Sequence, residues 1–264
     1  QGEADYDLVG IALARPELRP MLATTRNESD GDLIKDRLGY VTDKRGHDEI
    51  WLGSLGPSLV EVPLITPQDF GSDGTLMLSS PAFSPGGDRI AFLRNGAKPR
   101  QPLRIWTSAI VNGQTSGQPT LLVRRDYEAL QGAPSWSPDG TRIAYAEWKD
   151  DRWRLMKIQV GSDRPVQLRD DGVPNAAPRW SPKGDLITWE TEAGVMLVPP
   201  DEPARAIQTE QGVFPDDAWL VHSWSPDGSR IYAITRSQSH QLSLIELSGH
   251  EFKRMKVLAH LGSA

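Results

Sequence analysis

The chain has 264 residues, of which 38% are hydrophobic and 24% charged, with nine tryptophans and no cysteine. This composition is typical of a folded protein, and the absence of cysteine excludes disulfides, zinc–thiolate clusters and thiol nucleophiles. A formal net charge of −6 leaves no dominant basic surface, so we expect no nucleic-acid partner. No apolar run approaches the length of a membrane span, so we expect no direct membrane insertion.

The N-terminal part of the chain has strand patterns but no complete repeat. Residues 7–14 and 20–24 are predicted as the third and fourth strands of a unit that lacks its inner hairpin. Residues 37–55 are predicted as the second strand, turn and third strand of the next unit, whose first strand is weak. These patterns indicate one incomplete and one degenerate copy of a repeated unit.

Four copies of the motif aromatic-Ser-Pro-x-Gly-x-x-Ile follow without gaps, with their serines at Ser84, Ser137, Ser181 and Ser225. Each copy predicts a hairpin, because proline fixes φ in the turn and glycine supplies the positive φ that the turn needs. Third strands are expected at 103–106, 152–158, 195–198 and 241–247, and fourth strands at 120–123, 166–168, 205–207 and 255–258. Four strands in about 44 residues are typical of a propeller blade. Blades should begin near residues 30, 80, 132, 176 and 220.

The repeated Trp-Ser-Pro-Asp-Gly-x-Arg-Ile-Ala-Tyr resembles the TolB-like propeller repeat over roughly residues 30–260. That resemblance implies an all-β fold, a β-propeller of four-stranded blades that is usually six-bladed, with five blades evident here and one incomplete. The repeat also occurs in the propeller domains of prolyl oligopeptidase-type peptidases and in bacterial surface and periplasmic proteins. We therefore expect one propeller domain over residues 1–264, cut from a larger bacterial protein and placed outside the cytoplasm, in the periplasm or at the cell surface.

Most of the prominent residues of the repeat are interpreted as structural. Trp136, Trp180, Trp224 and Phe83 are expected to pack between blades. Three arginines recur at one blade position, and a shared salt bridge or hydrogen bond between blades is the simplest explanation for them; they are Arg89, Arg142 and Arg230.

Catalytic motifs are missing from the sequence. There is no Gly-x-Ser-x-Gly nucleophile elbow, and none of the five histidines has the i, i+4 partner of a zinc-binding His-Glu-x-x-His, so each is expected to be a surface or loop residue. The acidic segments near Asp30 and Asp69 lack the complete calcium-loop pattern. We predict no catalytic residues, no metal site and no cofactor.

Acidic and aromatic residues cluster in the predicted loops that join the outer strand of one blade to the inner strand of the next. In a propeller these loops gather on one face around the central channel, where ligands generally bind. The hypothesised binding set is Asp126, Tyr127, Asp171, Asn175, Asp217, Trp219 and His222. The alternative is that these loops are solvated and cap turns. A binding pocket of this composition would accept a cation, a basic peptide segment or a sugar.

The resulting hypothesis is a non-enzymatic propeller module that binds a protein, a peptide or another extracellular ligand as the sensor or scaffold part of a larger protein. Two alternatives stay open. One is a propeller-based glycan lyase or hydrolase with its site in the central channel, which would need convergent His, Arg and carboxylate groups. The other is an accessory domain that controls access of substrate to an attached peptidase.

Overall fold

The computed structural model describes residues 8–11, 13, 18–22, 27–55, 60–72, 76–95, 103–124, 128–174, 176–192, 194–209, 218–236 and 240–263. Within these ranges the regular structure consists of β-strands and three 3-10 helices of three or four residues: η1 (Pro67–Phe70), η2 (Pro203–Arg205) and η3 (His250–Phe252). The prediction of an all-β fold is confirmed.

Five successive groups of four antiparallel strands form the blades; three of them are separate four-stranded sheets, and the third and fourth are joined into one eight-stranded sheet by the pairing of Gly172 with Thr191. The first contains β3 (Glu28–Ile34), β4 (Arg37–Thr42), β5 (Glu49–Ser54) and β6 (Glu61–Ile65), and the second β7 (Leu78–Phe83), β8 (Arg89–Arg94), β9 (Arg104–Val111) and β10 (Gln114–Leu121). The third contains β11 (Ala129–Trp136), β12 (Arg142–Lys149), β13 (Arg152–Gln159) and β14 (Val166–Gly172). The fourth contains β15 (Arg179–Trp180), β16 (Ile187–Thr191), β17 (Gly194–Val198) and β18 (Ile207–Gln208). The fifth contains β19 (Ala218–Trp224), β20 (Ile231–Arg236), β21 (Gln241–Ser248) and β22 (Arg254–Ser263).

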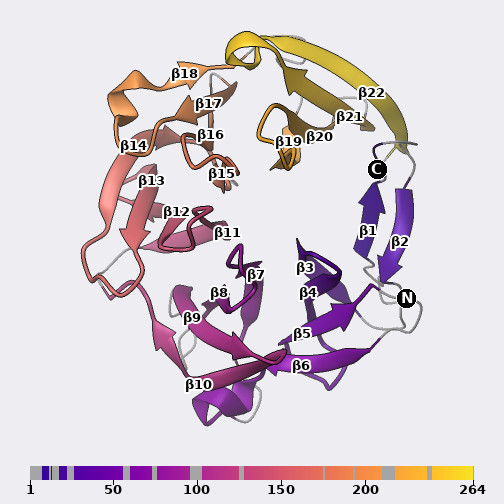
Figure 1. The fold of residues 1–264 in the computed structure, drawn as a ribbon, viewed down its shortest axis with the longest axis vertical. Helices are drawn as coiled ribbons and strands as arrows, with labels where there is room; N and C mark the ends of the chain where they lie inside the picture. Colours follow the sequence, from indigo (N-terminus) through magenta and orange to yellow (C-terminus); the bar gives the residue numbers. More distant parts are fainter. Residues whose placement is uncertain are drawn as a thin grey trace.

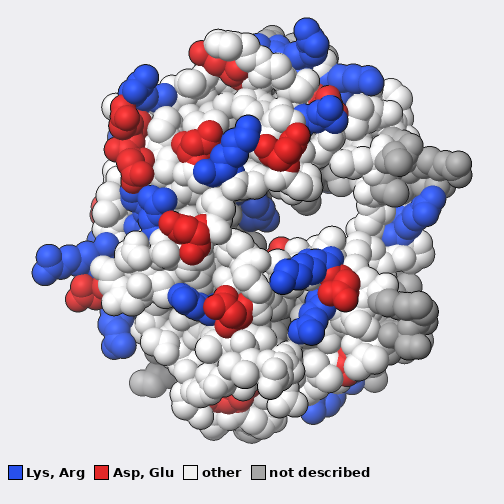
Figure 2. Space-filling model, in the orientation of Figure 1, with Lys and Arg blue, Asp and Glu red and all other residues white. Residues whose placement is uncertain are grey.

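These blades stand around a central axis with their first strands innermost, and β1 (Leu8–Ile11) and β2 (Leu18–Leu22) pair antiparallel in the remaining sector, between β22 and the β3–β6 blade (Figure 1). The predicted blade starts are therefore confirmed, and the two strands predicted for the N-terminal unit are present. Figure 2 shows the opening at the centre of the ring extended toward the β1–β2 sector, with acidic and basic residues interspersed around it.

Each Ser-Pro-x-Gly segment forms the turn between the first and second strands of a blade. The glycine N–H donates to the serine carbonyl in all four copies, at 2.8–2.9 Å, and each of these glycines has a positive φ. The serine hydroxyl donates to an aspartate two residues on, as Ser137 does to Asp139, or four residues on, as Ser84 does to Asp88 at 2.7 Å. The turn motif therefore contains one aspartate at either of two positions, and that aspartate secures the serine.

Contacts between blades come from the aromatic residue of the motif, as predicted. The Trp136 indole N–H donates to the Ala82 carbonyl of the preceding blade at 2.9 Å, and the Trp224 indole N–H donates to the Arg179 carbonyl at 3.1 Å. Of the recurrent arginines, Arg142 contacts the next blade, because its guanidinium lies 4.9 Å from the Trp180 ring centroid.

Arg142 also pairs with Asp201 at 3.4 Å, across the same blade boundary. Arg230 instead pairs with Glu246 of its own blade at 3.7 Å. The predicted inter-blade role is confirmed for Arg142 and is wrong for Arg230, since the partner of Arg230 lies on the third strand of the same sheet.

Candidate functional site

The structure describes only part of the binding set that the sequence predicted. Asp126, Tyr127, Asn175 and Asp217 lie outside the described residues, and Trp219 lies in β19 with its side chain outside them as well. Asp171 and His222 are described, and both lie in strands rather than in loops, Asp171 in β14 and His222 in β19. The loop assignment of these two residues is therefore wrong, because each strand extends further along the chain than its hydrophobic pattern indicates.

Asp171 is bound to a neighbouring arginine and a tryptophan. Its carboxylate accepts from Arg169 Nε at 3.1 Å and from Trp189 Nε1 of β16 at 3.3 Å. Burial raises the pKa of Asp171, but the hydrogen bond and positive charge of Arg169 outweigh it and hold the pKa below its usual value. Asp171 is thus an ionised contact between the third and fourth blades.

His222 is buried, with 4% of its surface exposed, so the expectation of a surface or loop histidine is wrong here. Its Nε2 lies 2.6 Å from Thr188 Oγ1 and its Nδ1 lies 2.9 Å from Glu190 Oε1, so both ring nitrogens have partners on β16. Successive strand residues point to opposite sheet faces. Trp189, which holds Asp171, therefore lies on the other face of β16 from Thr188 and Glu190, and the sheet separates Asp171 from His222.

A larger opening lies at the end of the channel formed by the Ser-Pro-x-Gly turns, which we call the channel mouth. It has a volume of about 370 Å³ and is lined by Pro85, Trp136, Pro138, Arg179, Trp180, Ser181, Pro182, Ser223 and Trp224. Its wall thus repeats the Trp-Ser-Pro segment of successive blades. Pro85, Pro182 and Ser223 are exposed, Trp224 is half-buried, and Trp136 and Trp180 are buried. The repeat that builds the turns thus also places tryptophan and proline side chains of four successive blades along one side of this mouth.

Below the mouth, the channel wall carries opposite charges. A second cavity of about 170 Å³ shares Pro85, Trp136 and Arg179 with the mouth and adds Asp32 of β3. Arg179 Nη1 donates to the Ala133 carbonyl at 3.2 Å. Burial lowers the pKa of Arg179, and the negative charges of Asp32 and Glu190 oppose that shift. Burial raises the pKa of Asp32, against a hydrogen bond from the Phe83 N–H and the charge of Arg179.

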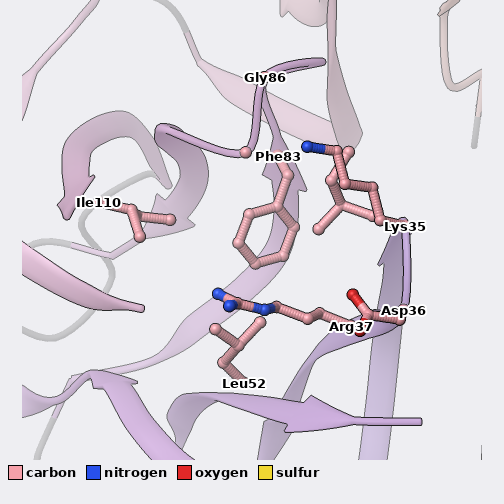
Figure 3. A pocket seen from close by; sticks show the side chains of 9 residues that line it. Lys35, Asp36, Arg37, Leu52, Phe83, Gly86 and Ile110 are labelled. Carbon is pink, nitrogen blue, oxygen red and sulfur yellow. The ribbon is translucent and has the colours of Figure 1, made fainter. Parts of the chain in front are cut away.

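A groove lies on the same face between the first two blades, and we call it the inter-blade groove. Its inner part, about 230 Å³, is lined by Ile34, Lys35, Asp36, Arg37, Leu52, Phe83, Gly86, Gly87 and Ile110. Its outer part, about 220 Å³, is lined by Arg37, Leu52, Gly53, Ser54, Val60, Val62, Asn112, Gly113 and Gln114. The two parts share Arg37 and Leu52. Figure 3 shows the Arg37 side chain lying across the inner part, with the Phe83 ring on one side and Leu52 on the other.

Neither opening was part of the predicted binding set. The signal for the channel mouth was present in the sequence, because the same Trp-Ser-Pro positions recur in each blade, but those positions were interpreted as scaffold alone. The groove had no such signal, since Lys35 and Arg37 belong to the degenerate first unit, which has no Ser-Pro. Within the described ranges, no three His, Asp or Glu side chains gather in a way that would hold a metal ion. The helices among those residues are too short and polar to cross a membrane.

Comparison with known proteins gives matches to proteins of several activities. No family model matches the chain. A TolB homologue from Chlorobium luteolum is 29% identical over 119 residues, which are 43% of this chain and 26% of that protein, so the match covers about a quarter of the relative. Among solved structures, TolB from Agrobacterium tumefaciens has a TM-score of 0.72 at 14% identity, over 94% of this chain and 86% of that one. An oligogalacturonate lyase from Vibrio parahaemolyticus has a TM-score of 0.63 at 12% identity, over 98% and 75%.

Proposed function

We propose that this chain, a TolB-like β-propeller in repeat and fold, is a non-catalytic module that binds a protein or peptide partner outside the cytoplasm and contacts it at the channel mouth. The observation that carries the proposal is the composition of that mouth, where tryptophan and proline side chains from successive blades line one side of the opening. Tryptophan is enriched among the residues that contribute most to protein–protein binding. Rigid aromatic and proline side chains also lose little conformational entropy when a partner binds.

The relatives support a binding role without deciding it, since they include TolB proteins and a lyase. A lyase or hydrolase needs acid, base and substrate-binding groups that converge on an accessible position. Two histidine–carboxylate pairs occur among the described residues. Both ring nitrogens of the buried His222 have partners, Thr188 and Glu190. His47 lies 3.0 Å from Glu49, whose buried carboxylate also accepts from Arg45 at 2.6 Å and from Trp51 at 2.8 Å. Because these contacts occupy His222 and the Glu49 carboxylate, both pairs favour a structural role and, with it, the non-catalytic function.

The test uses a displayed library of short random peptides, enriched on the wild-type chain and then titrated as synthetic peptides against variants. Ser223→Trp fills the mouth from an exposed position, so the fold should persist. We expect this change to weaken binding of the enriched peptides by about tenfold or more, as expected when a partner loses a central contact. Asp171→Ala and Trp219→Ala are the controls from the sequence-predicted set.

The seven residues predicted from the sequence remain a rival site, and the same titration separates the two. If Trp219→Ala abolishes binding while Ser223→Trp leaves it intact, the site belongs to the loops that precede the first strands. A basic partner bound there should also dissociate as salt is added, because exposed charge contacts are screened. Circular dichroism of every variant shows that a loss of binding is not a loss of fold.

A further inference from the structure

The inter-blade groove contains two basic side chains, Lys35 and Arg37, that have no partner among the described residues. Within the described ranges, the Arg37 guanidinium and the Lys35 ammonium donate no side-chain hydrogen bond, the Asp36 carboxylate accepts none, and none of the three forms an ion pair. Where this chain uses a guanidinium structurally, the guanidinium is paired, as Arg45 is with Glu49 at 2.6 Å. Two cations and one carboxylate leave the groove with an excess positive charge.

The accessible apolar surface beside Arg37 lies in the outer part of the groove. Val60 and Val62 line that part, whereas Leu52, Phe83 and Ile110 of the inner part are themselves buried. Val60 is 61% exposed, and Val111, next to the groove residue Ile110, is 56% exposed. Val60, with the half-buried Val62 beside it, gives the outer part an apolar wall next to Arg37.

Arg37 lies where the two parts meet. It lines both of them, and a Cβ placed on Gly113 would be 3.4 Å from Arg37 Nη1, so the guanidinium reaches the β9–β10 turn of the next blade. A guanidinium has five N–H donors in a planar fork that matches a carboxylate. Arg37 is exposed, so its contribution to binding a carboxylate is that of a surface ion pair with favourable geometry.

We propose that the inter-blade groove binds an extended polypeptide segment in which one Asp or Glu side chain lies between aliphatic residues. The carboxylate pairs with Arg37, and the flanking aliphatic side chains lie against Val60 and Val62 of the outer part. This site is separate from the channel mouth, and it depends on the proposed function only in that the partner is a protein. A bare phosphate satisfies the guanidinium but leaves the apolar walls uncovered, so the segment is favoured over a simple anion.

The experiment titrates two synthetic peptides, acetylated and amidated, against the full chain by calorimetry. One carries a single glutamate between valines within a Gly/Ser-rich sequence, and its twin carries glutamine in place of the glutamate. The wild type should bind the glutamate peptide about threefold or more tightly than the twin, as expected for a bidentate pair at an exposed arginine. Arg37→Gln should remove that preference, and Arg37→Lys should keep only part of it, because an ammonium lacks the fork.

The matched control is Arg236→Gln, an exposed arginine at the end of β20 that also has no partner among the described residues. It should leave both affinities unchanged. Equal binding of the two peptides by the wild type, or unchanged selectivity in Arg37→Gln, would overturn the proposal. Inorganic phosphate that binds as tightly as the glutamate peptide would overturn the choice of a polypeptide. Ser223→Trp should not affect the glutamate peptide, so failure of the channel mouth and failure of the groove are distinguished.

Discussion

Gly39 of β4 has no side chain where the Phe83 ring of the next blade lies. A Cβ built on Gly39 would be 2.2 Å from Phe83 Cε2 and 2.6 Å from Cζ, whereas nonbonded carbons pack at about 3.5–4.0 Å. Phe83 is 7% exposed, and its N–H donates to Asp32 at 2.7 Å, so its backbone is fixed and the ring must move. Gly39→Ala should therefore push the ring toward the inter-blade groove.

Two opposing effects determine how much Gly39→Ala changes the free energy of unfolding. Forced overpacking in a core costs about 1–3 kcal/mol, and replacing glycine by alanine in a strand returns about 0.5–1 kcal/mol by restricting the unfolded chain. We expect Gly39→Ala to lower the free energy of unfolding by about 1–2 kcal/mol on these combined grounds. Urea denaturation measures it as a lower midpoint with an unchanged slope.

Phe83→Leu tests the steric cause, since a smaller side chain removes the overlap. The double variant should be more stable than the sum of the two single changes by at least about 0.5 kcal/mol, which is the size of coupling seen between residues in contact. Gly46→Ala is the control for backbone strain alone, because Gly46 has a φ of +88° and nothing within 4 Å of its missing Cβ. Additive single and double variants, or a Gly39→Ala midpoint equal to that of the wild type, would refute the steric explanation.

Two further predictions concern one turn of the repeat. Gly140→Val should cost about 1–3 kcal/mol because a β-branched residue cannot adopt positive φ without strain; Gly140 has a φ of +67°. Its urea midpoint is compared with that of Thr141→Ser, which keeps the hydroxyl that donates to Asp139 at 2.9 Å. The hydrogen bond from Ser137, with the N–H and hydroxyl of Thr141, lowers the pKa of Asp139 to about 2. The stabilisation by this carboxylate is present above pH 3.8 and is lost as pH falls toward about 2. In Asp139→Asn, the free energy of unfolding should fall less than in the wild type as the pH is lowered through this range. The difference should be about 1 kcal/mol or less, since exposed pairs contribute little. An equal fall in the variant and the wild type would contradict this role of Asp139.

The sequence by itself was sufficient to predict the propeller. The four Ser-Pro-x-Gly copies imply hairpins at a fixed spacing, and the structure places those hairpins between the first and second strands of four blades. Turn chemistry is local, because proline, glycine and serine act within a few residues. The role of the repeated tryptophans also follows from repetition, since equivalent positions meet equivalent neighbours, as Trp136 meets the Ala82 carbonyl and Trp224 the Arg179 carbonyl of the preceding blade.

Tertiary structure decided which side chains meet. Asp171 and His222 look alike in sequence, as polar residues near the start of a blade, but they contact opposite faces of β16, where Trp189 holds one and Glu190 the other. Arg37 lies in the degenerate unit and matches no repeat position, yet the approach of the second blade places it across an apolar groove. Neither outcome can be read from a local pattern, because both depend on how one sheet packs against the next, and packing between blades joins residues that are far apart in the chain.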